Sequence, residues 1–537
     1  MAMHRVGEYI WDGKYDPDGK RRSVDPADVR VDPHALETVG VDDARSRLMR
    51  GDALGACAGL LRDGVNVQCC YIDPPFDVGH SFSMTADGPV AYGDRWGVDA
   101  RSYIHVMYER CAMIRGILAE DGCLLVHCDW RVSHRLRMML DELFGERNFR
   151  NEIVWAYRSG GASRRKSLPR KHDSILLYSK SEAFFIRPLT ERQYLRKPFM
   201  GSKVDADGRH YVDTLLRDVI EGAPTVLDEA GRPEEINCRP VLNVSADRLG
   251  YPTQKPRGLL ELLIRATTDP GDLVADLFCG SGTTLEAAAR TGRDFVGADI
   301  GGQAFRTTRA RLLRCGASFT ILDLGVTRRA DQPSKSDDEV LQSFGANKDA
   351  HGVWRRDGER CEIGVDGIRS VMHARETDAT VLFDRMTPEI AGMIEEALSA
   401  GVRIRPVMVP RELHDPCECE EPRWVGPTTF VVDCDNRDGE LTITLRDAKV
   451  DGHSKAPEDF IDSWAVDPSW DGVGTMRPMW RSARDAKTGK LCVEARIRRC
   501  GTGGSVGVIV VDLHGNVHRM RTLERAVHER SVPIIQA

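Results

Sequence analysis

The sequence lacks any apolar run long enough to cross a membrane. A spanning helix needs about 20 consecutive apolar residues, and no stretch of the 537 residues reaches that length. The opening residues, MAMHRVGEYI, are polar and charged and lack the apolar centre of a secretion signal. We therefore expect a cytoplasmic protein with no membrane segment. A chain of this length is also expected to form two or three domains.

Cysteine is present without a regular framework. The 15 cysteines are scattered along the chain, which favours reduced and mostly buried thiols over disulfides. The pattern nearest to a metal site brings together His414, Cys417 and Cys419, but no second ligand pair accompanies it. The sequence therefore predicts no metal centre.

A general excess of positive charge is also missing. The net charge is −7, so the chain is not a basic coat for nucleic acid. One loop is an exception, because residues 158–171 contain six cations and no acid. These cations are Arg158, Arg164, Arg165, Lys166, Arg170 and Lys171. The loop is either a solvated surface loop or a segment that binds the phosphate backbone of DNA.

Two nucleotide-binding motifs are absent as well. The sequence has no GxxxxGK[ST] phosphate loop and no complete GxGxxG fingerprint. No nuclease signature is evident either. Any DNA cleavage or ATP-driven movement would therefore need another polypeptide.

The chain alternates strand and helix patterns in two separated stretches. This rhythm predicts a parallel sheet covered by helices on both faces. Short β-type runs follow toward the C-terminus. We expect an N-terminal arm at 1–40, a catalytic α/β domain at 41–157 and 246–322, an inserted recognition region at 158–245, a linker at 323–352 and a β-rich domain at 353–537.

The first chemical motif is Asp73-Pro74-Pro75-Phe76, which follows the apolar run at 67–72. Two consecutive prolines remove two backbone donors and fix both φ angles. The corner is therefore stiff, and it holds an acid and an aromatic ring at fixed positions. Taken alone, it is also compatible with a turn that ends a strand.

The second motif is the segment DLFCGSGTT at 276–284, which joins a strand to a helix through Gly280 and Gly282. Glycines let the backbone approach a ligand closely, and the helix N-terminus offers unpaired N–H groups. Asp299 ends the next strand, where an acid can bind two ribose hydroxyls. The site is predicted to hold a nucleoside without a strong phosphate claw, which suits S-adenosylmethionine.

Together the two motifs resemble the amino-methyltransferases that modify exocyclic nitrogens of DNA bases. The DPPF segment precedes the FxGxG segment, and this order is similar to the β group of that family, which includes modification subunits of type III restriction systems. Supporting resemblances are RGDAL (50–54), GERNFRNEIVWAY (145–157), KHDSILLYSK (171–180) and YPTQKP (251–256). The stretch DFIDSWAVDPSW (459–470) resembles the tails of some modification subunits more loosely.

The resemblance implies a Rossmann-like, circularly permuted methyltransferase sheet that binds S-adenosylmethionine and methylates adenine N6 in double-stranded DNA. Asp73, Pro74, Pro75 and Phe76 would hold the flipped base. The cofactor residues would be Asp52, Thr253, Lys255, Asp276, Phe278, Gly280, Gly282 and Asp299. Relatives often dimerise and work beside a restriction, helicase or other defence subunit.

Three alternatives remain open at this point. Cytosine N4 is the second candidate substrate, although relatives that act on it more often begin the tetrapeptide with Ser. A non-catalytic recognition or scaffold subunit is a second class, against which the intact motifs argue. Methylation of RNA or of a protein glutamine is a third class, which usually goes with Asn-Pro-Pro.

Overall fold

The computed structural model describes most of the chain. The described residues are 8–16, 18–41, 44–75, 81–83, 90–93, 103–158, 168–241, 249, 251, 253–325, 328–329, 336–374, 376–383, 388–409, 428–437, 440–450, 453–470, 474–485, 490–498, 505–513 and 517–523. The chain divides into two compact units. Unit 1 comprises residues 1–28 and 45–317, and unit 2 comprises residues 29–44 and 318–537.

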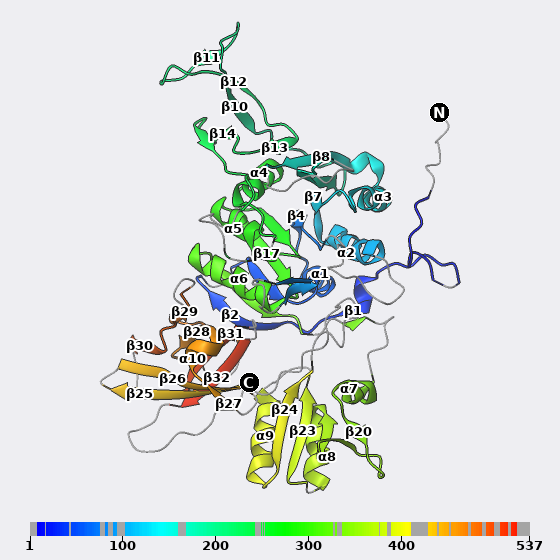
Figure 1. The fold of residues 1–537 in the computed structure, drawn as a ribbon, viewed down its shortest axis with the longest axis vertical. Coiled ribbons are helices and arrows are strands. Elements are labelled where there is room, and N and C mark those ends of the chain that lie inside the picture. Colours follow the sequence, from blue (N-terminus) through cyan, green and yellow to red (C-terminus); the bar gives the residue numbers. More distant parts are fainter. Residues whose placement is uncertain are drawn as a thin grey trace. The chain divides into compact units, whose positions relative to one another are not determined.

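A twisted mixed sheet forms the centre of unit 1 (Figure 1). Its spatial order is β13 (Val219–Glu221), β8 (Phe149–Ala156), β9 (His172–Ser179), β7 (Leu118–Cys128), β4 (Val67–Ile72), β16 (Leu273–Asp276), β17 (Asp294–Asp299) and β3 (Arg47–Arg50). Strands β7, β4, β16, β17 and β3 run parallel to their neighbours in that series. Strand β9 runs antiparallel to both β7 and β8.

Six helices flank this sheet in the described part of unit 1. They are α1 (Ala53–Arg62), α2 (Tyr103–Ile117), α3 (Ser133–Phe144), α4 (Arg257–Thr267), α5 (Thr283–Arg290) and α6 (Gly302–Arg314). Helices α1 to α3 pack in succession, as do α4 to α6, and the two groups lie on either side of the sheet (Figure 1). Strands such as β4 are buried on both faces, which explains their nearly continuous apolar sequence.

The boundary between α2 and β7 lies earlier than the helical pattern predicted. The apolar residues of 102–122 have helical spacing, so the sequence predicts a helix that ends at Gly122. In the structure α2 ends at Ile117 and β7 begins at Leu118. Leu118 pairs with Val67, and a shift in register separates that pair from the pairing of Cys123. The strand therefore absorbs the polar stretch before Gly122 as an irregularity, which a helical periodicity does not reveal.

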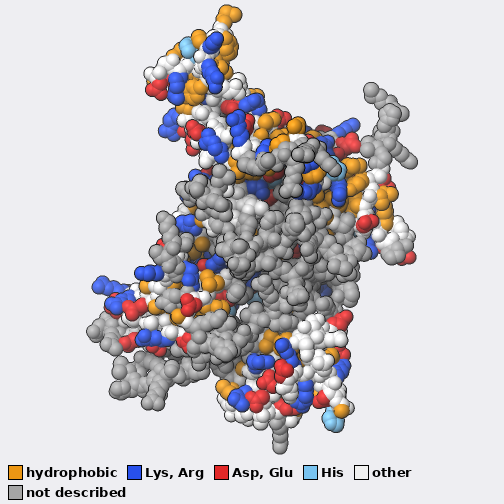
Figure 2. Space-filling model, viewed as in Figure 1, with side chains coloured by type: hydrophobic (Ala, Val, Ile, Leu, Met, Phe, Trp, Pro, Cys, Tyr) orange, Lys and Arg blue, Asp and Glu red, His pale blue; other side chains and the backbone are white. Residues whose placement is uncertain are grey.

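A second, smaller sheet extends from unit 1 as an arm (Figure 1). Its order is β11 (Lys203–Val204), β12 (His210–Leu215), β10 (Thr190–Tyr194), β14 (Thr225–Leu227) and β15 (Pro233–Glu235). Apolar, basic and acidic side chains are mixed on this arm (Figure 2). Strands β9 and β13 also fall within 158–245, but they belong to the central sheet, because the run SILLYS in β9 is buried.

Unit 2 begins with two antiparallel strand pairs. These pairs join β2 (His34–Val39) to β18 (Phe319–Asp323) and β1 (Val29–Arg30) to β19 (Arg328–Arg329). Fully buried Glu37 accepts a hydrogen bond of 3.1 Å from Arg481. The expected N-terminal arm is thus divided, since residues 29–40 pack within unit 2.

Residues 336–409 form an α/β layer, which differs from the β-rich expectation. The sheet order is β20 (Asn347–Lys348), β21 (Trp354–Arg356), β22 (Glu359–Ile363), β23 (Asp378–Phe383) and β24 (Arg403–Met408). Strands β22, β23 and β24 are parallel. The helices are α7 (Asp337–Ser343), α8 (Gly364–Ala374) and α9 (Pro388–Ser399). The apolar pattern of residues 388–401 predicts α9, whereas α7 and α8 lie in segments expected to form the linker and the β-rich domain.

The rest of unit 2 consists of two antiparallel sheets that share a core. One contains β25 (Thr428–Arg437), β26 (Glu440–Val450), β27 (His453–Lys455) and β30 (Glu494–Arg498), and the other β29 (Trp480–Ala483), β28 (Ile461–Asp467), β31 (Ser505–Asp512) and β32 (Val517–Leu523). Short α10 (Pro457–Phe460) connects them. Phe430, Leu441, Trp464 and Val508 from both sheets meet in one cluster. Among the described helices, none is long and apolar enough to cross a membrane.

Candidate methyl-transfer site

Several polar residues lie at one edge of the central sheet, where parallel strands end. Asp73 directly follows β4, and Asp276 ends the neighbouring strand β16. Asp299 ends β17, beside Arg50 at the end of β3. Ligands of open α/β sheets bind at this carboxyl edge. The two motifs that are far apart in sequence are therefore brought together on adjacent strands.

Asp73 is held by an ion pair with Lys255, which precedes helix α4. The Lys255 ammonium contacts Oδ2 of Asp73, and the two side chains are only 10% and 18% exposed. The negative charge of Asp73 is therefore balanced inside the site. The sequence analysis had counted Lys255 among the cofactor residues, and it did not foresee this partner.

The glycine loop requires its glycines. Gly280 and Gly282 have φ values of +48° and +73°, which L side chains adopt with strain. A Cβ at Gly282 would lie 2.7 Å from side-chain atoms of Thr308, and a Cβ at Gly280 would lie 3.3 Å from the ring of Tyr251. Both positions therefore disfavour other residues on conformation, and at Gly282 the space excludes a side chain as well.

Asp299 connects three strand ends through hydrogen bonds. Its carboxylate accepts from the backbone N–H of Gly280 at 2.8 Å and of Gly301 at 2.9 Å. Its carbonyl accepts from the N–H of Gly51 at 3.0 Å. Burial raises the pKa of Asp299 to about 6. The acid expected to hold the ribose thus also organises the loop around it.

Asp276 is almost fully buried at the start of the glycine loop. One carboxylate oxygen accepts from the backbone N–H of Phe278 at 3.1 Å and the other from the hydroxyl of Thr284 at 2.5 Å. Burial raises the pKa of Asp276 to about 7, and the charges of Asp73 and Asp299 act in the same direction. Two buried acids with raised pKa values at one edge of a sheet are typical of a functional site.

Two of the expected cofactor residues have other surroundings. Asp52 caps helix α1 by accepting from Leu54 N–H at 2.9 Å, and it forms an ion pair of 2.8 Å with buried Arg110. Thr253 is exposed, with a φ of +58° that is unusual for a β-branched residue. The roles of these two side chains toward a cofactor stay predictions.

A buried polar network lies at the same sheet edge and was not identified from the sequence. The hydroxyl of Tyr71 bonds Nδ1 of fully buried His127 at 2.8 Å, and His127 Nε2 lies 3.2 Å from Asp173. Tyr157 donates to the other oxygen of Asp173 at 3.1 Å. The signal was present, because His127 is a polar residue inside the apolar run CLLVHC. This network fixes the residue two positions before Asp73.

The predicted DNA-binding loop is described only at its ends. Arg158 pairs with Glu221 at 3.0 Å, and the guanidinium of Arg170 lies 3.7 Å from the ring of Trp130. Arg164, Arg165 and Lys166 lie outside the described residues, as does Phe76 of the DPPF corner. The structure therefore leaves the contribution of this loop as a prediction.

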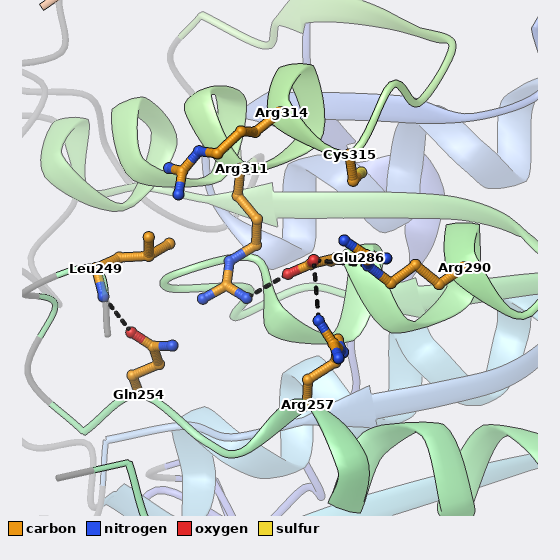
Figure 3. Close-up of a pocket in the computed structure, with 8 residues that line it drawn as sticks. All are labelled: Leu249, Gln254, Arg257, Glu286, Arg290, Arg311, Arg314 and Cys315. Carbon is orange, nitrogen blue, oxygen red and sulfur yellow. Dashed lines mark hydrogen bonds and ion pairs between the residues drawn. The ribbon is translucent and has the colours of Figure 1, made fainter. Parts of the chain in front are cut away.

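A separate pocket of about 190 Å³ lies beside helices α4, α5 and α6 (Figure 3). At its centre Glu286 binds Arg311 at 2.6 Å and Arg290 at 2.8 Å. Arg290 and Arg314 belong to the last turns of α5 and α6, where the helix dipole favours cations. The ion pairs of Glu286 with Arg290 and Arg311 form a network that joins helices α5 and α6. This network lies away from the sheet edge that carries Asp73.

No group of metal-ligating side chains was found within the described part of the chain. His414, Cys417 and Cys419 lie outside that part. The described cysteines are free thiols, most of them buried. Burial raises the pKa of Cys279, which lies inside the glycine loop, so this thiol is held in its unreactive neutral form.

Residues 67–310 match the family model described as DNA methylase, of the N6/N4 type. The type II methyltransferase M.EcaI of Enterobacter cloacae is 28% identical over 302 residues, covering 47% of this chain and 66% of the relative. The DNA adenine methyltransferase YhdJ of Escherichia coli K12 is 25% identical over 266 residues, covering 49% and 82%.

Two further similarities concern a modification subunit and a solved structure. The probable type III restriction-modification enzyme HindVI Mod subunit of Haemophilus influenzae is 28% identical over 154 residues, covering 28% of this chain and 19% of the relative. The crystal structure of the M1.HpyAVI–SAM complex is 19% identical, with a TM-score of 0.32. It covers 50% of this chain and 98% of that one.

Proposed function

We propose that this chain, whose residues 67–310 belong to the N6/N4 DNA methylase family, transfers a methyl group from S-adenosylmethionine to N6 of adenine in double-stranded DNA. The observation that carries the proposal is the placement of Asp73 and the glycine loop at the ends of the adjacent strands β4 and β16. A methyl acceptor held by Asp73 and a nucleoside cofactor held by the loop would therefore face each other.

The residues at this edge of the sheet fit S-adenosylmethionine. The left-handed glycines let the backbone approach a ligand, and Asp299 supplies an acid at the position where α/β folds bind ribose hydroxyls. The loop has no lysine phosphate claw, which agrees with a cofactor that carries no phosphate. When bound, this cofactor supplies an electrophilic methyl group.

The stiff corner would orient the target amine. The Asp73 carboxylate and the Pro74 carbonyl accept the two N–H groups of N6, which localises the nitrogen lone pair toward the methyl group. We assign the acceptance to Oδ1 of Asp73, because Lys255 binds Oδ2. As the C–N bond forms, the C–S bond breaks, and the surplus amine proton leaves through Asp73 to water.

Adenine is preferred over cytosine because the tetrapeptide begins with Asp and because one adenine methyltransferase is among the relatives. Cytosine N4 is the alternative, and a solved neighbour at 14% identity and a TM-score of 0.33 is a cytosine-N4 enzyme. Digestion of methylated DNA to nucleosides, followed by mass spectrometry, separates the two products. Dominant N4-methylcytosine would exclude the adenine assignment.

Labelled methyl transfer to mixed-sequence plasmid DNA tests the activity itself. We expect wild-type protein to label DNA and Asp73→Ala to label it at least about a thousandfold more slowly. Asp63→Ala, which changes a half-exposed acid at the end of α1, is the matched control and should retain activity. A fully active Asp73→Ala variant would contradict the proposal and favour a recognition or scaffold role.

The biological setting proposed is restriction-modification or phage defence, in a homodimer. The similarity to a type III Mod subunit supports a separate partner that cleaves or translocates DNA. Sedimentation of the purified chain tests the dimer. Single-molecule sequencing of DNA from an expressing host would give the methylated sequence.

A further inference from the structure

Two contacts between an arginine guanidinium and a tyrosine ring stabilise the arm of unit 1. The guanidinium of Arg192 lies 3.8 Å from the ring of Tyr211 and binds Asp213 at 2.8 Å and 3.2 Å. In the turn just before β12, the guanidinium of Arg209 lies 4.2 Å from the centre of the Tyr194 ring. These contacts cross the β10–β12 pairing, so the ribbon is held rigid without a helix covering it.

The free end of this ribbon exposes apolar side chains. Ser202 N–H bonds the carbonyl of Phe199 at 3.0 Å, and Gly201 has a φ of +96°, so residues 199–202 form a tight turn. Phe199 is 58% exposed and Met200 is 98% exposed. Figure 2 shows apolar side chains at the tip of the arm, with basic and acidic side chains interspersed below them. Exposed apolar side chains at the end of a stiff arm indicate a site that contacts another molecule.

Two basic residues beside the turn indicate an anionic binding partner. Arg196 and Lys197 directly precede Pro198 and Phe199, and both are exposed. Within the described residues neither has an acid within ion-pair distance, whereas Lys203 and Arg209 lower on the ribbon are paired with acids. Double-stranded DNA matches both features of this tip. Its phosphates would meet the two uncompensated cations, and its stacked bases would meet the apolar side chains.

The dimensions agree with a DNA groove. A two-stranded ribbon fits the major groove, and β10 and β12 form such a ribbon over five residue pairs, from Thr190–Leu215 to Tyr194–Tyr211. The base of the arm is fixed to unit 1, because Arg187 forms a bidentate pair with Asp269 at 2.7 Å and 2.6 Å.

We propose that Phe199 and Met200 form an apolar wedge that enters the base stack of the bound DNA and kinks it, while Arg196 and Lys197 bind the flanking phosphates. This inference rests on the proposed function, because it takes the DNA substrate as given. The wedge opens the duplex where a base must leave it, so the energy cost of base flipping is partly met by the arm.

The test uses the full-length protein and a duplex selected from a random pool by binding to the wild type. Dyes at the two duplex ends report bending by energy transfer. Phe199→Ser/Met200→Ser should lose the bend and raise the dissociation constant about tenfold or more. Phe199→Leu/Met200→Leu should restore both. Leu215→Ser, which changes another exposed apolar residue of the arm, should behave as wild type.

Methyl transfer to intact and to mismatched duplexes separates a wedge from simple adhesion. The serine double variant should slow transfer to the intact duplex and recover on a duplex with a mismatch at the target, where stacking is already broken. Wild-type bending and transfer in that variant would overturn the wedge, as would lost self-association with unchanged bending. A wild type that bends DNA without methylating it would leave the wedge standing and refute the proposed function.

Discussion

Removing the ammonium of Lys255 should destabilise unit 1 more than removing both members of its pair. In Lys255→Met the carboxylate of Asp73, which is 18% exposed, loses the cation that compensates its charge. Breaking a fully buried ion pair costs about 3–5 kcal/mol, whereas replacing both charges is close to neutral. Allowing for the residual exposure, we expect about 2–3 kcal/mol for Lys255→Met and under about 1 kcal/mol for Asp73→Asn/Lys255→Met.

Scanning calorimetry of the full chain provides the measurement. The two units are expected to unfold separately, so the transition that S-adenosylmethionine shifts is followed. A loss of 2–3 kcal/mol corresponds to roughly 5 °C in a unit of this size. Lys180→Met, which removes a lysine at the opposite end of β7, controls for loss of positive charge. A double variant at least as unstable as Lys255→Met would refute the reasoning.

Three further predictions follow from the site and the helix network. Gly282→Ala should weaken the binding of S-adenosylmethionine, measured by titration calorimetry, at least about tenfold, because left-handed strain adds to a clash with a neighbouring threonine. The control Gly271→Ala, with φ +87° and open space around it, should bind as wild type. An equal loss of affinity in both variants would contradict the clash. The raised pKa of Asp276, about 7, means that the folded protein binds a proton between about pH 4 and 7 that the unfolded chain releases. Unfolding free energy should therefore fall as pH rises through that window, by up to about 4 kcal/mol, and Asp276→Asn should flatten the profile; an unchanged slope in urea melts would disprove it. Glu286→Gln should cost about 3 kcal/mol in thermal unfolding, because buried Arg311 loses its anion, and a neutral result would show that solvent replaces the pair.

The sequence was informative where a local motif coincides with a topological rule. The positions of Asp73 and Asp276 follow from two apolar strand patterns and from the tendency of parallel strands to align their carboxyl ends. Gly280 and Gly282 were likewise identified by residue type, because a turn with positive φ requires glycine. These features depend on a few neighbouring residues, and a single sequence contains them.

Long-range pairings were not accessible in the same way. Lys255 and Asp73 are 182 positions apart, and no local pattern indicates that the lysine binds the acid. The pairing of His127 with Asp173 depends on strands that run antiparallel within an otherwise parallel sheet. The helix α8 was missed because its sequence, GVDGIRSVMHA, begins among glycines that favour loops.

Helix α4 lies between the base of the arm and the corner that carries Asp73. Just beyond its C-terminus, Asp269 forms an ion pair with Arg187 at the base of the arm. Just before its N-terminus, Lys255 forms an ion pair with Asp73. The helix is eleven residues long, which corresponds to about 16 Å. The contact that anchors the base of the arm and the contact that neutralises Asp73 are therefore separated by a single helix.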